Sequence, residues 1–286
     1  MRSKLESALP FGLLFPSVAF LALLIIVPIG QAFLLAFQSE TGDFSLSAFQ
    51  RMVGDTAFNE AVRNTFLLLL AIVPLQIILA LAMALVIHTR LRGQTFFLYI
   101  FAIPLAISDL AAGLVWLSIF TERGYLNSLL HHLGWIQQPI LFLSYQNLQG
   151  IFSAIVVAEA WRATAIVLVI LVAGLQMIPR DYFEAAELFG AGTLKRTWYV
   201  VLPLLRPSLQ TALIIRTLFA FQTFAVVFAL AGRTLPVLAG EAYTWYYSNR
   251  NPAVAAAMAF LILLLSLAAT IVYLRVLRVR EEEVGR

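Results

Sequence analysis

The sequence predicts an all-α polytopic membrane protein with six transmembrane helices. Hydrophobic residues make up 62% of the 286 residues and charged residues only 12%, about half of the charged share in an ordinary soluble domain. The apolar residues gather in nearly uncharged runs of helix length, without the alternating ten-residue segments of a membrane β-barrel. A chain of this length has no room for a large soluble domain besides, so we expect residues 1–286 to form a single transmembrane domain.

Six apolar runs are the predicted spans, and in chain order they cover residues 11–37, 64–87, 95–120, 148–178, 204–231 and 253–274. The first run follows Arg2 and Lys4, as the core of a signal peptide would. It is too long for a cleaved core and lacks a clear cleavage site with small residues, so we expect it to remain as a helix. The fourth run is expected to stop at Ile178-Pro179, and Pro203 stands at the head of the fifth.

The distribution of basic residues predicts the orientation of these spans. With a cytoplasmic N-terminus, and with Arg206 at the head of the fifth run counted as inside, twelve of the 19 lysines and arginines fall inside the cell, five fall outside and two lie within spans. Because basic residues are enriched on the cytoplasmic side, both termini are expected in the cytoplasm. The segment between the fourth and fifth runs, residues 179–203, is then cytoplasmic as well.

A short helix is predicted within this segment. Asp181 is a suitable N-cap with Glu184 at the third helical position, and Gly190 is a suitable residue for ending the helix. The result is a helix of about two turns between two spans. The segment also carries apolar side chains, which in a water-exposed stretch indicate a docking site.

The side chains of this helix suggest how a partner would be held. Ala185 and Ala186 keep its surface low, so that another backbone can approach, while Phe183 and Phe189 are expected to project as apolar anchors into a pocket. The alternative is an amphipathic helix that rests on lipid headgroups.

The same residues resemble a known signature. Glu184-Ala185-Ala186, then Gly190, then Val200-Val201-Leu202-Pro203 is similar to the cytoplasmic motif of the permease subunits of bacterial ATP-binding-cassette importers, with Val200 where isoleucine is usual. Other pieces resemble the carbohydrate branch of this family, the maltose and glycerol-phosphate type, and the resemblance covers roughly residues 10 to 280. These pieces are Asn64-Thr65, Pro74-Leu75-Gln76, Leu91-Arg92-Gly93, Trp161 and Gly174-Leu175-Gln176-Met177-Ile178-Pro179.

The resemblance implies a fold, a mechanism and a set of partners. It implies the type I importer permease fold, in which a cytoplasmic coupling helix lies between helices 4 and 5 and docks on an ATPase subunit. The coupling residues that it implies here are Phe183, Glu184, Ala185, Ala186, Phe189, Gly190, Leu202 and Pro203. The implied partners are a second permease, expected to be a different chain, two cytoplasmic ATPase subunits and an extracytoplasmic solute-binding protein. The implied location is the plasma (inner) membrane of a bacterium or archaeon. The chain is expected to contact membrane lipid and to bind no nucleic acid.

Several enzymatic functions lack their motifs in this chain. There is no glycine-rich phosphate loop that ends in Gly-Lys-Ser/Thr, so ATP and magnesium are expected on partner subunits and no cofactor on this chain. The zinc pattern His-Glu-x-x-His and the nucleophile elbow Gly-x-Ser-x-Gly are also missing from the sequence. The adjacent His131 and His132 have no third ligand nearby in sequence, so we expect no metal site.

Polar side chains inside the predicted spans are the candidates for the substrate path. Asp109 lies in the third span, Glu159 and Arg162 in the fourth and Arg216 in the fifth, at depths where ionisable groups face a bundle interior or a wet cavity. Glu159 and Arg162 are three residues apart, so they share a helix face and can pair. The alternative is that these residues only fix helix packing, although we favour a cavity role for Arg216.

A sugar would need aromatic faces and hydrogen-bonding groups along the path. Trp161, Phe219 and Gln222 are the candidates for this role, with Phe221 and Phe224 nearby; lipid contact is the alternative for the phenylalanines. Two other functions stay open on the sequence alone. The first is the same architecture with a polyamine, phosphate or glycerol-phosphate as cargo, and the second is a stand-alone polytopic enzyme or channel.

Overall fold

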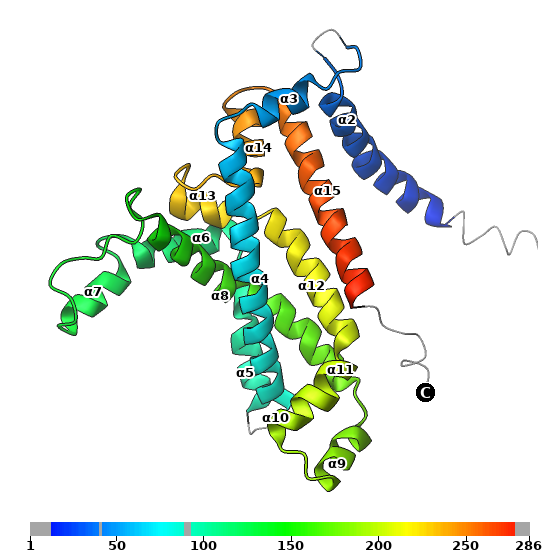
Figure 1. The fold of residues 1–286 in the computed structure, drawn as a ribbon, viewed down its shortest axis with the longest axis vertical. Helices are drawn as coiled ribbons and strands as arrows, with labels where there is room; N and C mark the ends of the chain where they lie inside the picture. The colour runs from blue at the N-terminus through cyan, green and yellow to red at the C-terminus, as the bar shows by residue number, and fades with distance from the viewer. Residues whose placement is uncertain (1–12, 40–41, 89–92, 278–286) are drawn as a thin grey trace, which may run out of the picture. The chain divides into compact units, whose positions relative to one another are not determined.

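The structure is a computed structural model that describes residues 13–39, 42–88 and 93–277 (Figure 1). It divides into two compact units, Met1–Phe58 with Glu241–Leu261, and Asn59–Gly240 with Ile262–Arg286. Several residues that entered the sequence predictions lie outside the described residues, namely Arg2, Lys4, Arg90, Leu91, Arg92, Arg278, Arg280 and Arg286.

Long apolar helices dominate the fold, and the predicted all-α polytopic class is confirmed. Among the described residues, four helices are long and apolar enough to cross a membrane, and the number rises to six if each of two bent pairs is one span. The four are Leu13–Ala36, which ends in α2 (Val27–Ala36), then α4 (Phe58–His88), α8 (Leu148–Gln176) and α15 (Pro252–Val276).

The third predicted span, 95–120, is broken in the structure. It consists of α5 (Gln94–Ala102), a 3-10 turn at Ile103–Ala106 and α6 (Asp109–Phe120), which continues toward α7 (Tyr125–His132), and the two halves are bent by 101°. Pro104 lies in the turn, and the Ser108 hydroxyl accepts a hydrogen bond from the Ala111 N–H at 3.2 Å. A proline and a new N-cap therefore restart the helix in another direction.

The fifth predicted span, 204–231, is broken as well. The chain enters it through α10 (Thr193–Arg196), a π-helical turn at Thr197–Val201 and α11 (Leu202–Leu204). This stretch is bent by 72° from α12 (Arg206–Phe221). Pro203 and Pro207 flank the bend and cannot donate backbone hydrogen bonds, which explains its position. A second break separates α12 from α13 (Ala225–Ala231).

The smaller unit has its own apolar core. It contains α2, α3 (Ser47–Val53), the end of α14 (Leu238–Tyr247) and the first part of α15. The ring of Phe260 meets those of Phe33 and Phe37 at centroid distances of 5.5 Å each. The helix Leu13–Ala36 itself has none of its apolar window buried, so it offers a free apolar face to the membrane.

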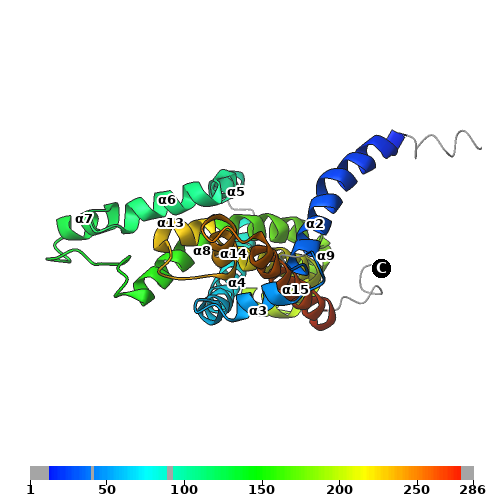
Figure 2. The same cartoon turned by 90° about the horizontal axis from the view of Figure 1, so that it is seen from above.

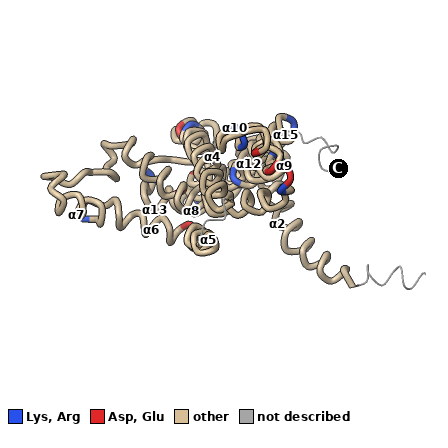
Figure 3. Tube along the Cα trace, turned by 90° about the horizontal axis from the view of Figure 1, so that it is seen from below, with Lys and Arg blue, Asp and Glu red and all other residues tan. Residues whose placement is uncertain are grey.

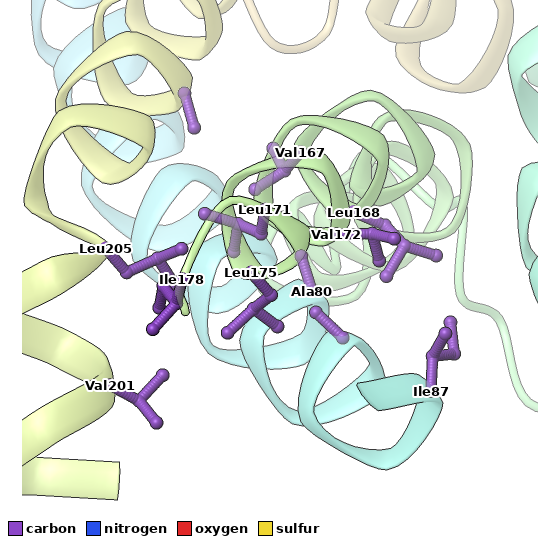
Figure 4. Close-up of a cluster of buried hydrophobic side chains, with 12 residues drawn as sticks. Ala80, Ile87, Val167, Leu168, Leu171, Val172, Leu175, Ile178, Val201 and Leu205 are labelled. Carbon is purple, nitrogen blue, oxygen red and sulfur yellow. The ribbon is translucent and has the colours of Figure 1, made fainter. Parts of the chain in front are cut away.

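The larger unit contains two cores that both involve α4 and α8. The first, which we call the Leu171 core, joins these helices to Val201 and Leu205 (Figure 4). The second, the Ile155 core, joins them to α13 and to the chain that follows it. The Leu171 core lies at the end of the unit that carries the segment 179–203, so this segment is anchored in packed side chains.

Two glycines allow helices of the larger unit to approach closely. A Cβ at Gly174 on α8 would lie 2.6 Å from the Ser208 Cβ on α12. A Cβ at Gly113 on α6 would lie 2.7 Å from the Ala229 Cβ on α13, and α6 and α13 lie side by side in both views of the fold (Figures 1 and 2). The last part of the third predicted span, α6, is therefore packed against the last part of the fifth, α13.

Candidate functional site

A network of charged side chains lies inside the larger unit, with Glu159 at its centre. Glu159 is 1% exposed, and its carboxylate accepts hydrogen bonds from Arg162 at 3.1 Å and from Arg216 at 3.2 Å. The predicted pairing of Glu159 with Arg162 is confirmed. Both arginines donate to the same carboxylate oxygen. Arg162 lies on α8 with Glu159, whereas Arg216 lies on α12, so the bond from Arg216 ties α8 to α12.

Gln76 on α4 completes the buried part of the network. Its amide nitrogen donates to the Glu159 backbone carbonyl at 2.7 Å, and its amide oxygen accepts from the Arg216 Nε. Gln76 is fully buried, and every one of its bonds holds a neighbouring helix. Gln76 belongs to the Pro74-Leu75-Gln76 motif but was not among the predicted site residues; an amide within an apolar run was the signal in the sequence that could have identified it.

Asp109 forms the outer edge of the network. It is the first residue of α6, directly after the 101° bend, and its carboxylate lies 2.8 Å from the Arg162 guanidinium. The Asp109 side chain is 57% exposed, whereas that of Arg162 is 16% exposed. Asp109 therefore pairs with Arg162 and not with Arg216, and it starts a new helix inside the third predicted span, 95–120.

The buried network is electrically balanced. Two carboxylates, Asp109 and Glu159, face two guanidinium groups, Arg162 and Arg216, so the four charges cancel. Buried charges are tolerated inside a protein when they are paired and hydrogen-bonded, and this arrangement meets the condition. The Arg216 side chain, for which the sequence favoured a cavity role, is only 1% exposed here and is enclosed by Gln76 and Glu159.

The aromatic and amide candidates lie at accessible positions. Trp161 is 37% exposed and Phe219 is 52% exposed, and Gln222 is exposed directly after the end of α12. The Trp161 ring meets that of Trp116 on α6 edge to face at 6.0 Å. Trp161 lies between Glu159 and Arg162 in the sequence of α8, and more than a third of its side chain is accessible.

The predicted coupling helix is α9 (Arg180–Leu188). Its N-cap is Pro179, so the expectation that Asp181 caps it was wrong; Asp181 lies in the first turn, where its charge still favours the helix dipole. The prediction that Gly190 ends the helix is confirmed, since its φ is +72° and its N–H donates to the Glu187 carbonyl at 2.9 Å. Together with the bond from the Ala191 N–H to the Ala186 carbonyl at 2.9 Å, this is a Schellman motif.

The two phenylalanines of the segment differ in their surroundings: one is exposed and the other is packed against the protein. Phe189 is 91% exposed and Leu188 is 88% exposed, so the end of α9 presents a bare apolar surface. Phe183 instead packs against the Leu171 core, and its ring lies 4.8 Å from that of His88. The expectation that Phe183 projects as an anchor was therefore wrong: in a nine-residue helix, one face must bury itself on the protein to hold the helix in place.

The remaining coupling residues follow the same division. Glu184 and Ala185 are exposed on α9, whereas Ala186 is buried against the protein. Leu202 and Pro203 are half-buried at the far end of the segment. Arg196 links the two ends, because it pairs with Glu187 and its guanidinium lies 6.0 Å from the centre of the Phe183 ring. Figure 3 shows the charged residues of α9 and α10 gathered close together.

The described residues offer no cluster suited to a metal ion. Within residues 13–39, 42–88 and 93–277, no three or more histidine, cysteine, aspartate or glutamate side chains come together as such a group. The long apolar helices, with paired charges buried among them, define a polytopic membrane protein.

The chain belongs to the family of binding-protein-dependent transport system inner membrane components. The sequence model of this family matches residues 76–279. It is 31% identical to the sulfoquinovosyl glycerol transport system permease protein of Agrobacterium fabrum, with 94% of this chain and 90% of the relative covered. It is 30% identical to the trehalose/maltose transport system permease protein of Thermococcus litoralis, with 97% and 96% covered. The chain is thus a multi-pass inner-membrane permease and not an enzyme.

The fold is also that of a solved importer. A chain in the crystal structure of a bacterial alginate ABC transporter, in complex with an alginate pentasaccharide-bound periplasmic protein, superposes with a TM-score of 0.81. The two sequences are 17% identical, and 97% of each chain is covered. The breaks in the third and fifth helices therefore belong to a chain whose whole path matches an importer permease.

Proposed function

We propose that this permease forms, with a second and different permease chain, the membrane path for a sugar that an extracytoplasmic binding protein delivers. Two cytoplasmic ATPase subunits would bind ATP and magnesium, and both termini of this chain would be cytoplasmic. Support for a sugar comes from two relatives named for sulfoquinovosyl glycerol and for trehalose and maltose. A third relative, from Brucella abortus, is named for sn-glycerol-3-phosphate and is 29% identical.

The observation that carries the coupling role is the two-faced packing of α9. Its bare surface, Leu188 and Phe189, is available to a cleft of an ATPase subunit. Its other face, through Phe183, rests on the same core that holds Val201 and Leu205. A force on the exposed end of α9 would therefore reach α8 and α12 together through packed side chains, as a rigid lever requires.

The substrate path is proposed along the accessible edge of the charge network. Trp161, Phe219 and Gln222 would offer aromatic faces and an amide to a sugar, and Asp109 with Arg162 would offer hydrogen-bonding groups. Glu159 and Arg216 would support these groups from within. Because each arginine of the network already faces a carboxylate, the network offers no unpaired guanidinium to a phosphate, so we expect a neutral sugar to be carried in preference to a phosphorylated compound.

The coupling role is tested in the complete importer with Phe189→Asp. We expect this variant to assemble with the second permease but to lose most ATPase binding and most uptake, because a charge replaces the apolar anchor. Leu133→Asp, at a 53% exposed leucine after α7, is the matched control and should retain both. Full uptake by Phe189→Asp would refute the role of α9, whereas loss in both variants would indicate a general folding defect.

The cargo is tested by binding to the cognate extracytoplasmic protein and by uptake into proteoliposomes. Neutral mono- and disaccharides, glycerol phosphate, inorganic phosphate and a polyamine form the panel. We expect uptake of a neutral sugar, and Trp161→Ala should raise its half-saturating concentration without releasing the ATPase subunits. Exclusive uptake of a phosphorylated compound would overturn the neutral cargo and leave the permease role intact.

A further inference from the structure

The stretch between α9 and α12 presents a second exposed apolar surface, separate from that of α9. We call residues Thr193–Leu204, which comprise α10, the π-helical turn and α11, the entry segment. On it, Tyr199 is 80% exposed, Leu194 is 74% exposed and Trp198 is 63% exposed. The turn around Gly190 separates this surface from Leu188 and Phe189, so the two surfaces belong to different elements (Figure 1).

The π-helical turn sets which side chains share this surface. Pro203 has no N–H, and its ring crowds the carbonyl four residues before it, so the helix widens there. The backbone N–H of Leu202 reaches the Thr197 carbonyl, five residues back. The wider turn rotates Val201 away from Trp198 and into the Leu171 core, where it is 2% exposed. The entry segment is consequently two-sided, with one face in the protein and one face bare.

The direction of the entry segment relates it to the membrane surface. It is inclined by 72° to α12, which carries the apolar path of the fifth span. If α12 runs close to the membrane normal, a segment at this angle to it lies nearly along the plane of the bilayer, at the level where the chain enters it. Its bare face carries a tryptophan, a tyrosine and a leucine, and the aromatic residues are those enriched at membrane interfaces.

The charges around the bare face are also those of an interfacial helix. Lys195 and Arg206 are exposed at its borders and can reach anionic headgroups. Arg196, in contrast, is turned back to Glu187 and Phe183, so it belongs to the contact with α9. Basic residues therefore flank the aromatic surface, while the acidic residues of the whole segment 179–203 lie on α9.

We propose that the entry segment lies in the headgroup region of the bilayer, with Leu194, Trp198 and Tyr199 at the boundary of the acyl chains. The occupant of this surface is lipid and not an ATPase subunit. Anchored in this way, the entry segment fixes the depth of α9 through the contacts of Arg196 with Glu187 and Phe183. The proposal depends on the membrane path of α12 and not on the docking role of α9, so the two can fail separately.

The experiment uses the complete importer in nanodiscs of phosphatidylcholine and phosphatidylglycerol. The sequence contains no cysteine, so a single cysteine can carry a nitroxide label in an otherwise unaltered chain. The labelled variants are Leu194→Cys and Tyr199→Cys, with Leu188→Cys as the control on α9. Collision of each label with oxygen, which concentrates in lipid, is compared with collision with a water-soluble nickel chelate, before and after the ATPase subunits are added.

We expect the labels at positions 194 and 199 to collide several-fold more with oxygen than with the chelate, with and without the ATPase subunits. The label at position 188 should collide with the chelate in the isolated permease pair, and the ATPase subunits should shield it from both reagents. Chelate access at 194 and 199 would overturn the proposal in favour of a water-exposed surface. Shielding from both reagents there, upon addition of the ATPase subunits, would overturn it in favour of a second docking site.

Discussion

Removing the charge of Glu159 is expected to destabilise the permease far more than removing an exposed charge. The Glu159 carboxylate lies 3.2 Å from the guanidinium of Arg216, and both side chains are 1% exposed. At an effective dielectric constant of about 20, two unit charges at this separation attract each other by roughly 5 kcal/mol. Measured losses from breaking a buried pair, about 3–5 kcal/mol, agree with this scale because the other charge stays buried without a partner.

A single and a double variant, together with a control, separate this effect from a general loss of packing. We expect Glu159→Gln to lower the midpoint of thermal unfolding in detergent by roughly 10 °C, at about 2–4 °C per kcal/mol. Glu159→Gln combined with Arg216→Met should recover much of the loss, since no charge is then left unpaired. Glu60→Gln is the control, because Glu60 is 46% exposed and lies 3.6 Å from Arg63, where such a pair contributes about 0–1 kcal/mol. Equal shifts for Glu159→Gln and Glu60→Gln would refute the reasoning.

Three further predictions concern backbone positions and helix contacts. Gly174→Ala should lower the free energy of unfolding by about 1–3 kcal/mol through overpacking between α8 and α12, measured by denaturant titration; an unchanged midpoint would contradict the close approach. Gly190→Ala, at a φ of +72°, should cost about 1–2 kcal/mol and speed hydrogen exchange in α9, whereas Gly192→Ala, which meets open space, should leave exchange unchanged. In the native chain the Leu238 N–H donates to the Thr65 hydroxyl at 3.0 Å, and Thr65→Val removes this acceptor. The free energy of unfolding should fall by about 1–3 kcal/mol, and a neutral effect in the same titration would argue against this bond.

The local features of the site could be predicted from the sequence. Glu159 and Arg162 stand three residues apart on a helix, and this spacing alone brings them onto one face. Gly190 could be recognised because a helix end that needs a positive φ favours glycine. Both predictions depend only on neighbouring residues, so they did not require knowledge of the tertiary structure.

The features that depend on distant residues could not be predicted. The arginine partner of Asp109 is set by the 101° bend before α6, and apolar composition does not report a bend when both lipid and protein are apolar surroundings. The inward direction of Phe183 is set by the core to which it belongs, which is formed by helices far away in sequence. Gln76 could be seen as an unusual residue in a span, but its bonds to α8 and α12 required the structure.

The neutrality of the charge network has a consequence for how the membrane potential acts on this permease. A unit charge that crosses the whole potential gains or loses about 2.3 kcal/mol per 100 mV. If Asp109, Glu159, Arg162 and Arg216 move together, they carry no net charge, and the voltage does no work on their displacement. If α6 withdraws alone and takes Asp109 with it, a negative charge separates from a positive one, and that step becomes voltage-dependent. With an uncharged cargo, the voltage dependence of transport would therefore report whether Asp109 and Arg162 part during the cycle.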